Sequence, residues 1–332
     1  MAQNELFNHE IISTFKSAQD AQIIQSVEVG QTDCLNELVF FFKPEVLAVE
    51  DDQKIANSLN LVQEKFNQFD VKVCGAAIIP GKSLEKYEIM NRHYGFINQL
   101  SRMASKMVDD ETRAEIFEIL GKIDTGNYRI MGGHEFLNHF KVEISSLAEI
   151  WSGDDSIKLR SGFYLLDVIF HDEPLIIING FHPKQLIHFT KEDHRIYLML
   201  LHTDTDWHAM KFDLVGDTFP EKAAEGSIRN IMYNSPETFG LREVNIGANC
   251  VHLSAGPFEA AFEVNNFFGS LLDLDATKTP PLAVKNAHKS SLSLEKALGL
   301  MENPTHNDQD LFTESENLNT DSAVKLAHDW FS

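Results

Sequence analysis

Two short apolar segments separated by one amphipathic helix constrain the fold of this chain more than any other feature. Residues 37–43 read ELVFFFK and residues 71–79 read VKVCGAAII, and each segment is followed directly by a proline. Apolar runs of this length, rich in aromatic and β-branched residues, are typical of buried strands. Between them, apolar residues recur at helical spacing from Ile55 to Phe66. This strand–helix–strand order indicates an α/β sandwich.

The same alternation returns in the second half of the chain. A strand is predicted at 196–202, a helix near 207–215, a strand near 244–252 and a helix at 257–272. Between the two halves, 109–122 has a helical pattern, and 162–170 and 174–180 read as two strands joined by the turn HDE. The pattern of residues 136–151 fits neither helix nor strand, and its type is left open.

Charge restricts the classes of partner. The chain has 28 Lys and Arg against 50 Asp and Glu, a net charge of −22 with neutral histidines. A field of that sign repels nucleic-acid backbones and anionic lipid surfaces, so we expect no nucleic acid and no membrane partner. A small anionic ligand in a local basic pocket remains compatible with this charge.

Cysteine usage and the apolar runs indicate an intracellular protein. Cys34, Cys74 and Cys250 are odd in number and far apart, so we expect neither a disulfide framework nor a cysteine zinc site. The first residues lack the basic-then-apolar pattern of a signal peptide. Apolar runs are far shorter than the ~20 residues that span a bilayer. The expected location is the cytoplasm.

Residues 247–268 hold the most informative combination of polar side chains. His252 ends a predicted strand, Ser254 follows two residues later, and Glu263 lies on a helix that begins with a proline. A carboxylate on an adjoining helix can hold one imidazole nitrogen as N–H and leave the lone pair on the other. This arrangement is typical of a histidine nucleophile or proton carrier. A capped strand end with a surface histidine is the alternative interpretation.

Six features, in chain order, resemble those of the nucleoside diphosphate kinase family. The segment around His252 resembles the family's phosphohistidine motif N-x-x-H-G-S-D, with Asn249, His252 and Ser254 at the matching positions and Glu263 on the helix that follows. The other resemblances lie upstream: Lys43-Pro44-Glu45 to K-P-D, His93-Tyr94 to H-Y, residues 216–220 (GDTFP) to G-x-T-N-P, and residues 226–229 (GSIR) to G-T-I-R.

The resemblance implies a role for each matching residue. His252, beside Ser254 and oriented by Glu263, would take the terminal phosphate of a nucleoside triphosphate and pass it to a nucleoside diphosphate. The remaining roles concern the nucleotide: Lys43 and Arg229 on the phosphates, the Thr218 hydroxyl on a phosphate oxygen, Tyr94 positioning the phosphates and the histidine, and Asn249 on the sugar hydroxyl. Mg²⁺ would be held mainly by phosphates and water, so no protein metal site is expected.

Two positions depart from the family pattern. Phe212, with Lys211 beside it, stands where the family has an arginine six residues before the threonine. Loss of a charge-assisted phosphate contact costs about 1.5–3 kcal/mol. Leu253 replaces a glycine, which predicts a bulky side chain beside the nucleophile. Arg242 is a candidate replacement for the missing arginine. The alternative function is therefore a catalytically weakened nucleotide-binding or regulatory protein on the same fold.

A third hypothesis rests on a stretch rich in histidine and acidic residues. Such side chains at alternating positions can ligate zinc or iron, which would support metal-dependent hydrolysis. The spacing matches no specific site, and an Asp before the helix near 207 is more simply its N-cap. The residues concerned are His171, Asp172, Glu173, His182, His188, His194 and the segment 202–208 (HTDTDWH).

The resemblance also implies the architecture. It predicts a ferredoxin-like sandwich of an antiparallel sheet with helices on one face, formed by residues 34–108 and 190–273. Residues 1–33 are then an N-terminal extension, 109–189 an inserted α/β segment, and 274–332 an acidic tail whose short helices can dock on the body or on a partner. The family's assembly makes a homo-oligomer an expectation, and the insertion or tail offers a surface for a protein partner.

Overall fold

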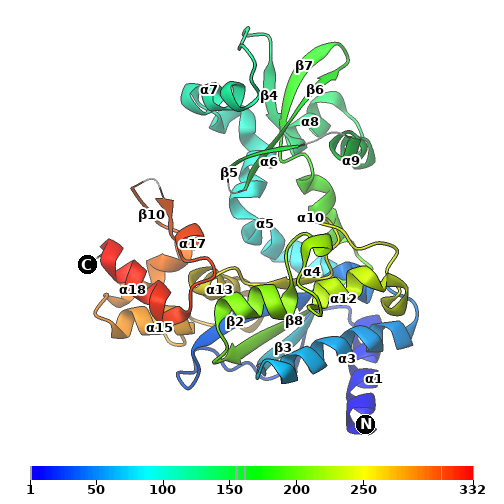
Figure 1. Cartoon of the computed structure of the whole chain (residues 1–332), viewed down its shortest axis with the longest axis vertical. Coiled ribbons are helices and arrows are strands. Elements are labelled where there is room, and N and C mark those ends of the chain that lie inside the picture. The colour runs from blue at the N-terminus through cyan, green and yellow to red at the C-terminus, as the bar shows by residue number, and fades with distance from the viewer. Residues whose placement is uncertain (1, 154–155, 161, 308, 332) are drawn as a thin grey trace. The chain divides into compact units, whose positions relative to one another are not determined.

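The computed structural model describes residues 2–153, 156–160, 162–307 and 309–331 (Figure 1) and contains two compact units. Unit 1 comprises residues 1–89 and 189–332, and unit 2 comprises residues 90–188. The insertion expected at 109–189 therefore begins earlier, near residue 90. The physical reason is that Leu100 and Ala104 are buried in a hydrophobic cluster with strand residues of unit 2.

Unit 1 is built on a five-stranded antiparallel sheet with the order β1-β3-β8-β2-β9. The strands β2 and β3 are joined by helix α3, β8 lies between them, and β9 pairs with the outer edge of β2. This order is that of a ferredoxin-like fold, with β1 as an additional edge strand, and it confirms the predicted sandwich. The elements are β1 (Gln22–Gln25), β2 (Asn36–Phe42), α3 (Asp52–Gln68), β3 (Lys72–Pro80), β8 (Arg195–Thr203) and β9 (Val251–Leu253).

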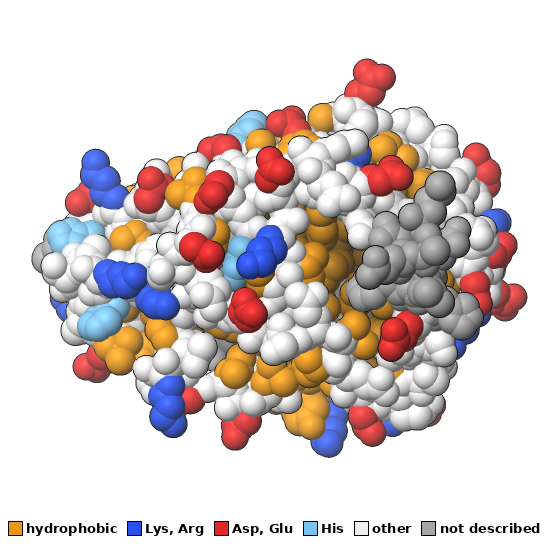
Figure 2. Space-filling view, turned by 90° about the horizontal axis from the view of Figure 1, so that it is seen from below, with side chains coloured by type: hydrophobic (Ala, Val, Ile, Leu, Met, Phe, Trp, Pro, Cys, Tyr) orange, Lys and Arg blue, Asp and Glu red, His pale blue; other side chains and the backbone are white. Residues whose placement is uncertain are grey.

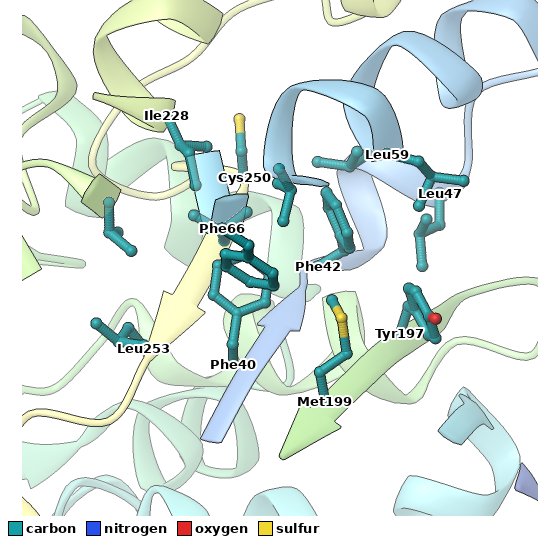
Figure 3. Close-up of a cluster of buried hydrophobic side chains, with 14 of the residues drawn as sticks. Phe40, Phe42, Leu47, Leu59, Phe66, Tyr197, Met199, Ile228, Cys250 and Leu253 are labelled. Atoms are coloured by element: carbon teal, nitrogen blue, oxygen red, sulfur yellow. The ribbon is translucent and has the colours of Figure 1, made fainter. Parts of the chain in front are cut away.

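One face of this sheet carries the main hydrophobic core (Figure 3). Phe40 and Phe42 alternate with Phe41 along β2 and meet the apolar stripe of α3, where Phe66 lies 5.2 Å from Phe40 between ring centroids. Buried side chains of Met210 and other residues from the β8–β9 connection complete this core. That connection contains α11 (Trp207–Ala209), the π-helical turn η1 (Met210–Val215), η2 (Pro220–Lys222), α12 (Ile228–Asn234) and η3 (Pro236–Phe239).

The opposite face of the sheet is covered as well, so the expectation of helices on one face is wrong. Phe41 packs against Phe189 and Phe267, at 6.1 and 5.6 Å between ring centroids. Phe267 follows helix α13 (Pro257–Val264) in the π-helical turn η4 (Asn265–Gly269), which leads into α14 (Ser270–Leu272). This second layer exists because β2 is buried at every position and has two apolar faces.

The segment predicted as an acidic tail forms a packed helical layer on α13. Phe258 and Ala261 of α13 share a hydrophobic cluster with Leu311, Ala323 and other residues of these helices. Its elements are α15 (Leu282–Lys289), α16 (Leu294–Gly299), η5 (Leu300–Glu302), β10 (Thr305–His306), β11 (Gln309–Asp310), α17 (Leu311–Glu314) and α18 (Thr320–Phe331). The remaining helices of unit 1 are α1 (Ala2–Ser17), α2 (Pro44–Leu47) and α4 (Gly81–Lys86).

Unit 2 has its own four-stranded sheet with the order β4-β7-β6-β5, in which β4 and β7 are parallel. The two strands predicted at 162–170 and 174–180 are confirmed as β6 (Phe163–Phe170) and β7 (Glu173–Ile178), whereas β4 (Arg129–Gly132) and β5 (Ile157–Arg160) were not predicted. The helices are α5 (Ile89–His93), α6 (Gly95–Met107), α7 (Asp110–Ile119), α8 (Gly133–Phe140), α9 (Ile144–Gly153) and α10 (His182–Thr190), which crosses into unit 1.

One strand prediction in unit 1 is mostly wrong. Of residues 244–252, only the last two form strand, because Asn245 and Ala248 close a tight turn through two backbone hydrogen bonds. Cys250 then takes a left-handed conformation with φ +71°, which interrupts the extended backbone.

Surface charge follows the composition. The face drawn in Figure 2 shows acidic side chains spread over its whole extent, with basic side chains standing singly among them. Cys34, Cys74 and Cys250 are unbridged. None of the helices in the described part of the chain combines the length and the apolar composition that crossing a bilayer requires.

Candidate active site

Strand β9 presents His252 to helix α13. His252 pairs in register with Phe41, and their rings stack at 4.5 Å between centroids with 17° between planes. Neighbouring Val251 and Leu253 point to the main core on the other face, as strand alternation requires. On the α13 side, His252 Nε2 lies 2.7 Å from Glu263 Oε1.

Glu263 is fully buried, and both of its oxygens have a donor. Oε1 bonds His252, and Oε2 accepts from the Ser254 hydroxyl at 2.5 Å. The same hydroxyl oxygen accepts the backbone N–H of Val39 at 2.9 Å, which ties the site to β2. Because a carboxylate only accepts, it stabilises the tautomer with the proton on Nε2 and the lone pair on Nδ1. The structure thus brings together the three residues that sequence analysis placed at the reaction centre.

Lys43 and Asn249 form a second group at the end of β2. Lys43 Nζ donates to Asn249 Oδ1 at 2.6 Å, and Asn249 Nδ2 donates to the Thr218 carbonyl at 3.1 Å. Burial lowers the pKa of Lys43 to about 8; nearby Glu45 opposes this shift, and Arg229 reinforces it. A partly desolvated ammonium beside an amide is suited to phosphate oxygens. Thr218 itself is exposed, and its carbonyl contacts this group through Asn249.

Two residues that sequence reasoning left without a role support the candidate site. Glu45 Oε1 accepts the backbone N–H of Cys250 at 2.9 Å, while the Lys43 N–H donates to the Cys250 carbonyl at 2.8 Å. The strained backbone of Cys250 is thereby held from β2 and α2. Phe41 is the other, as the stacking partner of His252. Its position two residues before Lys43 in the predicted strand 37–43 was the available signal, because alternation puts both on the same face.

Arg229 lies beneath this site and is buried. Its Nη2, Nη1 and Nε donate to the carbonyls of Val251, Gly216 and Asn249 at 2.8, 2.9 and 3.3 Å. Burial lowers the pKa of this guanidinium to about 10, which leaves it charged at neutral pH. The sequence resemblance assigned Arg229 to the phosphates, whereas the guanidinium in this structure binds backbone.

The residues at and near the departures from the family pattern each have a clear location in the structure. Lys211 forms an ion pair with Glu316, and Phe212 packs on His208 at 4.5 Å between ring centroids. Arg242 is exposed in the loop before β9. Leu253 is buried in the main core, so the expected bulky side chain beside the nucleophile is absent. That expectation is wrong because Leu253 and His252 point to opposite faces of β9.

Tyr94 belongs to unit 2, where it precedes α6 and its ring lies 5.5 Å from that of His182.

The histidine- and acid-rich stretch is dispersed: the pair of Glu37 and His202 is buried inside the sheet of unit 1 at 2.9 Å, and His182 bonds Asn98 in unit 2 at 3.2 Å. None of the histidines and acidic residues described between 171 and 208 belongs to a cluster of three or more potential metal ligands.

Comparisons with known proteins leave this site without an assigned family. No protein-family model matches the sequence, and no curated protein matches it. Among solved structures, the chain is similar to an NDP kinase from Pyrobaculum aerophilum, at 16% sequence identity and a TM-score of 0.32. The similarity covers 70% of this chain and 95% of that one. A score this low adds nothing to the arguments from strand order and side-chain geometry.

Proposed function

We propose that this protein is a nucleoside diphosphate kinase-like phosphotransferase that acts through phosphohistidine at His252. The observation that carries the proposal is the bond between His252 Nε2 and the fully buried Glu263, with Ser254 on the second carboxylate oxygen. A carboxylate that is shielded from solvent and bonded to one nitrogen of a strand-end histidine prepares the other nitrogen for nucleophilic attack.

In the proposed reaction, Nδ1 of His252 attacks the terminal phosphorus of a nucleoside triphosphate in line. The N–P bond forms as the bond to the bridging oxygen breaks, and the nucleoside diphosphate leaves with that electron pair. Glu263 retains the proton on Nε2 and stabilises the positive charge that develops on the ring. A second nucleoside diphosphate then takes the phosphate through its terminal oxygen, and the imidazole regains its lone pair.

The nucleotide would be held by the group at the end of β2. Lys43 meets the phosphates, Asn249 the sugar hydroxyl, and Thr218 a phosphate oxygen, while Tyr94 of unit 2 is assigned by sequence resemblance alone. Lys43 and Asn249 are a cation and an amide, a donor set that suits phosphate rather than a divalent ion. These residues fit Mg²⁺ as an ion carried by the phosphates, where it neutralises their charge.

A second candidate function is nucleotide binding without efficient transfer, in a regulatory or interaction protein. The observation that favours it is that two cations expected near the phosphates have protein partners: Arg229 binds three carbonyls, and Lys211 pairs with Glu316.

Labelling with γ-phosphate-labelled ATP and Mg²⁺ separates the two functions. The transferase predicts an acid-labile, alkali-stable label that is lost on adding a nucleoside diphosphate and is absent from His252→Ala. His208→Ala, which removes an exposed histidine of the same unit, is the matched control and should label normally. Binding of ATP without any label would establish the second function instead, and label on His252→Ala would refute the proposed nucleophile.

A further inference from the structure

Strand β9 is an edge strand, and its outer edge carries carbonyls that the sheet does not use. It pairs with β2 on one side only. Unpaired backbone groups on an edge need another partner when water is excluded. The guanidinium of Arg229, from helix α12, supplies that partner for Val251 at 2.8 Å. It also donates at 3.3 Å to Asn249, two residues before the strand, whose carbonyl accepts the Val251 N–H as well.

The third bond of Arg229 reaches a different segment. Nη1 donates to the Gly216 carbonyl at 2.9 Å, in the turn that precedes Thr218. Gly216 has φ +97°, and a Cβ there would lie 2.5 Å from the hydroxyl of Ser227, the N-cap of α12. The turn is therefore packed against the start of the helix that carries Arg229. One side chain joins the helix, the turn and the edge of β9.

The geometry of a guanidinium makes this arrangement specific. Its donors lie in one plane with fixed directions, so a lysine ammonium cannot make the same set of bonds. Arg229 is 8% exposed, and each of its three nitrogens donates to a backbone carbonyl. Contact with a phosphate would require the guanidinium to give up these charge-assisted bonds to the backbone.

We propose that Arg229 is a positioning residue that clamps the free edge of β9 to the turn at Gly216, and thereby fixes the backbone that leads into His252, instead of binding the nucleotide phosphates. The clamp itself concerns the fold alone, whereas its effect on His252 rests on the proposed phosphotransfer. Val251 directly precedes His252, and Asn249 lies two residues before Val251, so loosening this segment displaces the imidazole relative to Glu263.

Two substitutions separate a clamp from a phosphate ligand. Arg229→Lys keeps the charge and loses the planar fork, and Arg229→Gln loses both. The clamp predicts that each variant slows phosphohistidine formation at saturating ATP by about tenfold or more, with the two within about threefold of each other. Arg160→Lys, at an exposed arginine paired with Glu115 in unit 2, is the matched control and should retain the wild-type rate.

Amide hydrogen exchange in nucleotide-free protein provides the second readout. The clamp predicts faster exchange in peptides covering 214–218 and 249–253 of Arg229→Lys, with exchange of β3 unchanged, which also shows that the variant is folded. The proposal is overturned if Arg229→Lys labels like the wild type while Arg229→Gln does not, or if exchange at β9 is unaltered. If wild-type protein takes no label, the proposed function fails, and hydrogen exchange alone decides on the clamp.

Discussion

Replacing Glu263 with glutamine tests the central contact of the proposed mechanism. Glutamine keeps the shape of the side chain but replaces one oxygen with an NH₂ group. The Ser254 hydroxyl can turn to accept from that NH₂, so the remaining oxygen can still face His252. The bond to Nε2 then changes from charge-assisted to neutral, from about 1.5–3 to about 0.5–1.5 kcal/mol. The difference of about 1–1.5 kcal/mol corresponds to a five- to tenfold loss of rate.

Rapid-quench measurement of phosphohistidine formation at saturating ATP is the appropriate assay, because it isolates the step in which charge develops on the ring. Glu259→Gln is the matched control on the same helix, one turn away. Burial, reinforced by the charge of Glu263, raises the pKa of Glu259 to about 8, so its carboxyl is neutral at pH 7 and glutamine resembles it. We expect Glu259→Gln to retain the wild-type rate at pH 7.

Two results would refute this reasoning. A rate for Glu263→Gln within about twofold of wild type would show that the carboxylate charge does not assist attack. A loss of about a thousandfold or more would show that Glu263 takes the Nε2 proton during the attack, instead of only stabilising the charge on the ring.

Three further predictions follow from other parts of unit 1. Because the pKa of Lys43 lies near 8, its ammonium loses its proton above that pH, and ATP affinity measured by calorimetry should fall about tenfold per pH unit above pH 8; a flat profile would contradict contact with phosphate. Gly216→Ala should destabilise the fold by about 1–3 kcal/mol in urea unfolding, whereas Gly247→Ala, whose Cβ would meet the Asn245 side chain at an ordinary contact distance of 3.4 Å, should change little. Glu37 accepts from His202 and from the N–H groups of Gly30 and Leu282, so Glu37→Ala should cost about 3–5 kcal/mol of unfolding free energy; a loss under about 1 kcal/mol would show that water replaces these bonds.

The parts of the fold that follow local pattern were predictable from sequence. The runs that became β2 and β3, and the helix between them, are continuous, strongly periodic and bounded by proline, so local chemistry and tertiary packing agree. The strand predicted at 244–252 was too long because the apolar residues before β9 form a tight turn and lead into Cys250, which has a left-handed backbone. Short strands such as β1 and β4 have too few residues to show a period, and their partners supply the pairing energy.

The candidate site shows the same division. The order of His252, Ser254 and Glu263 was readable because strand alternation and helical spacing determine it. The binding partners of Arg229 and Lys211 were not predictable. A cationic residue in a sequence does not indicate whether its side chain will bind a carbonyl, a carboxylate or a phosphate. The position of Leu253, in contrast, was predictable. The alternation that points His252 towards α13 also points Leu253 into the core on the opposite face of the strand.

The central position of β8 has a consequence for how this chain is made. The ribosome delivers β2 and β3 early, but the strand that must lie between them is synthesised only after the whole of unit 2 has emerged. Unit 2, with its own sheet and cores, can fold first, while the phenylalanine-rich β2 is still unpaired because β8 and β9 have not been synthesised. During that interval the nascent chain exposes an apolar strand to aggregation, and it is then that assistance from chaperones would matter most.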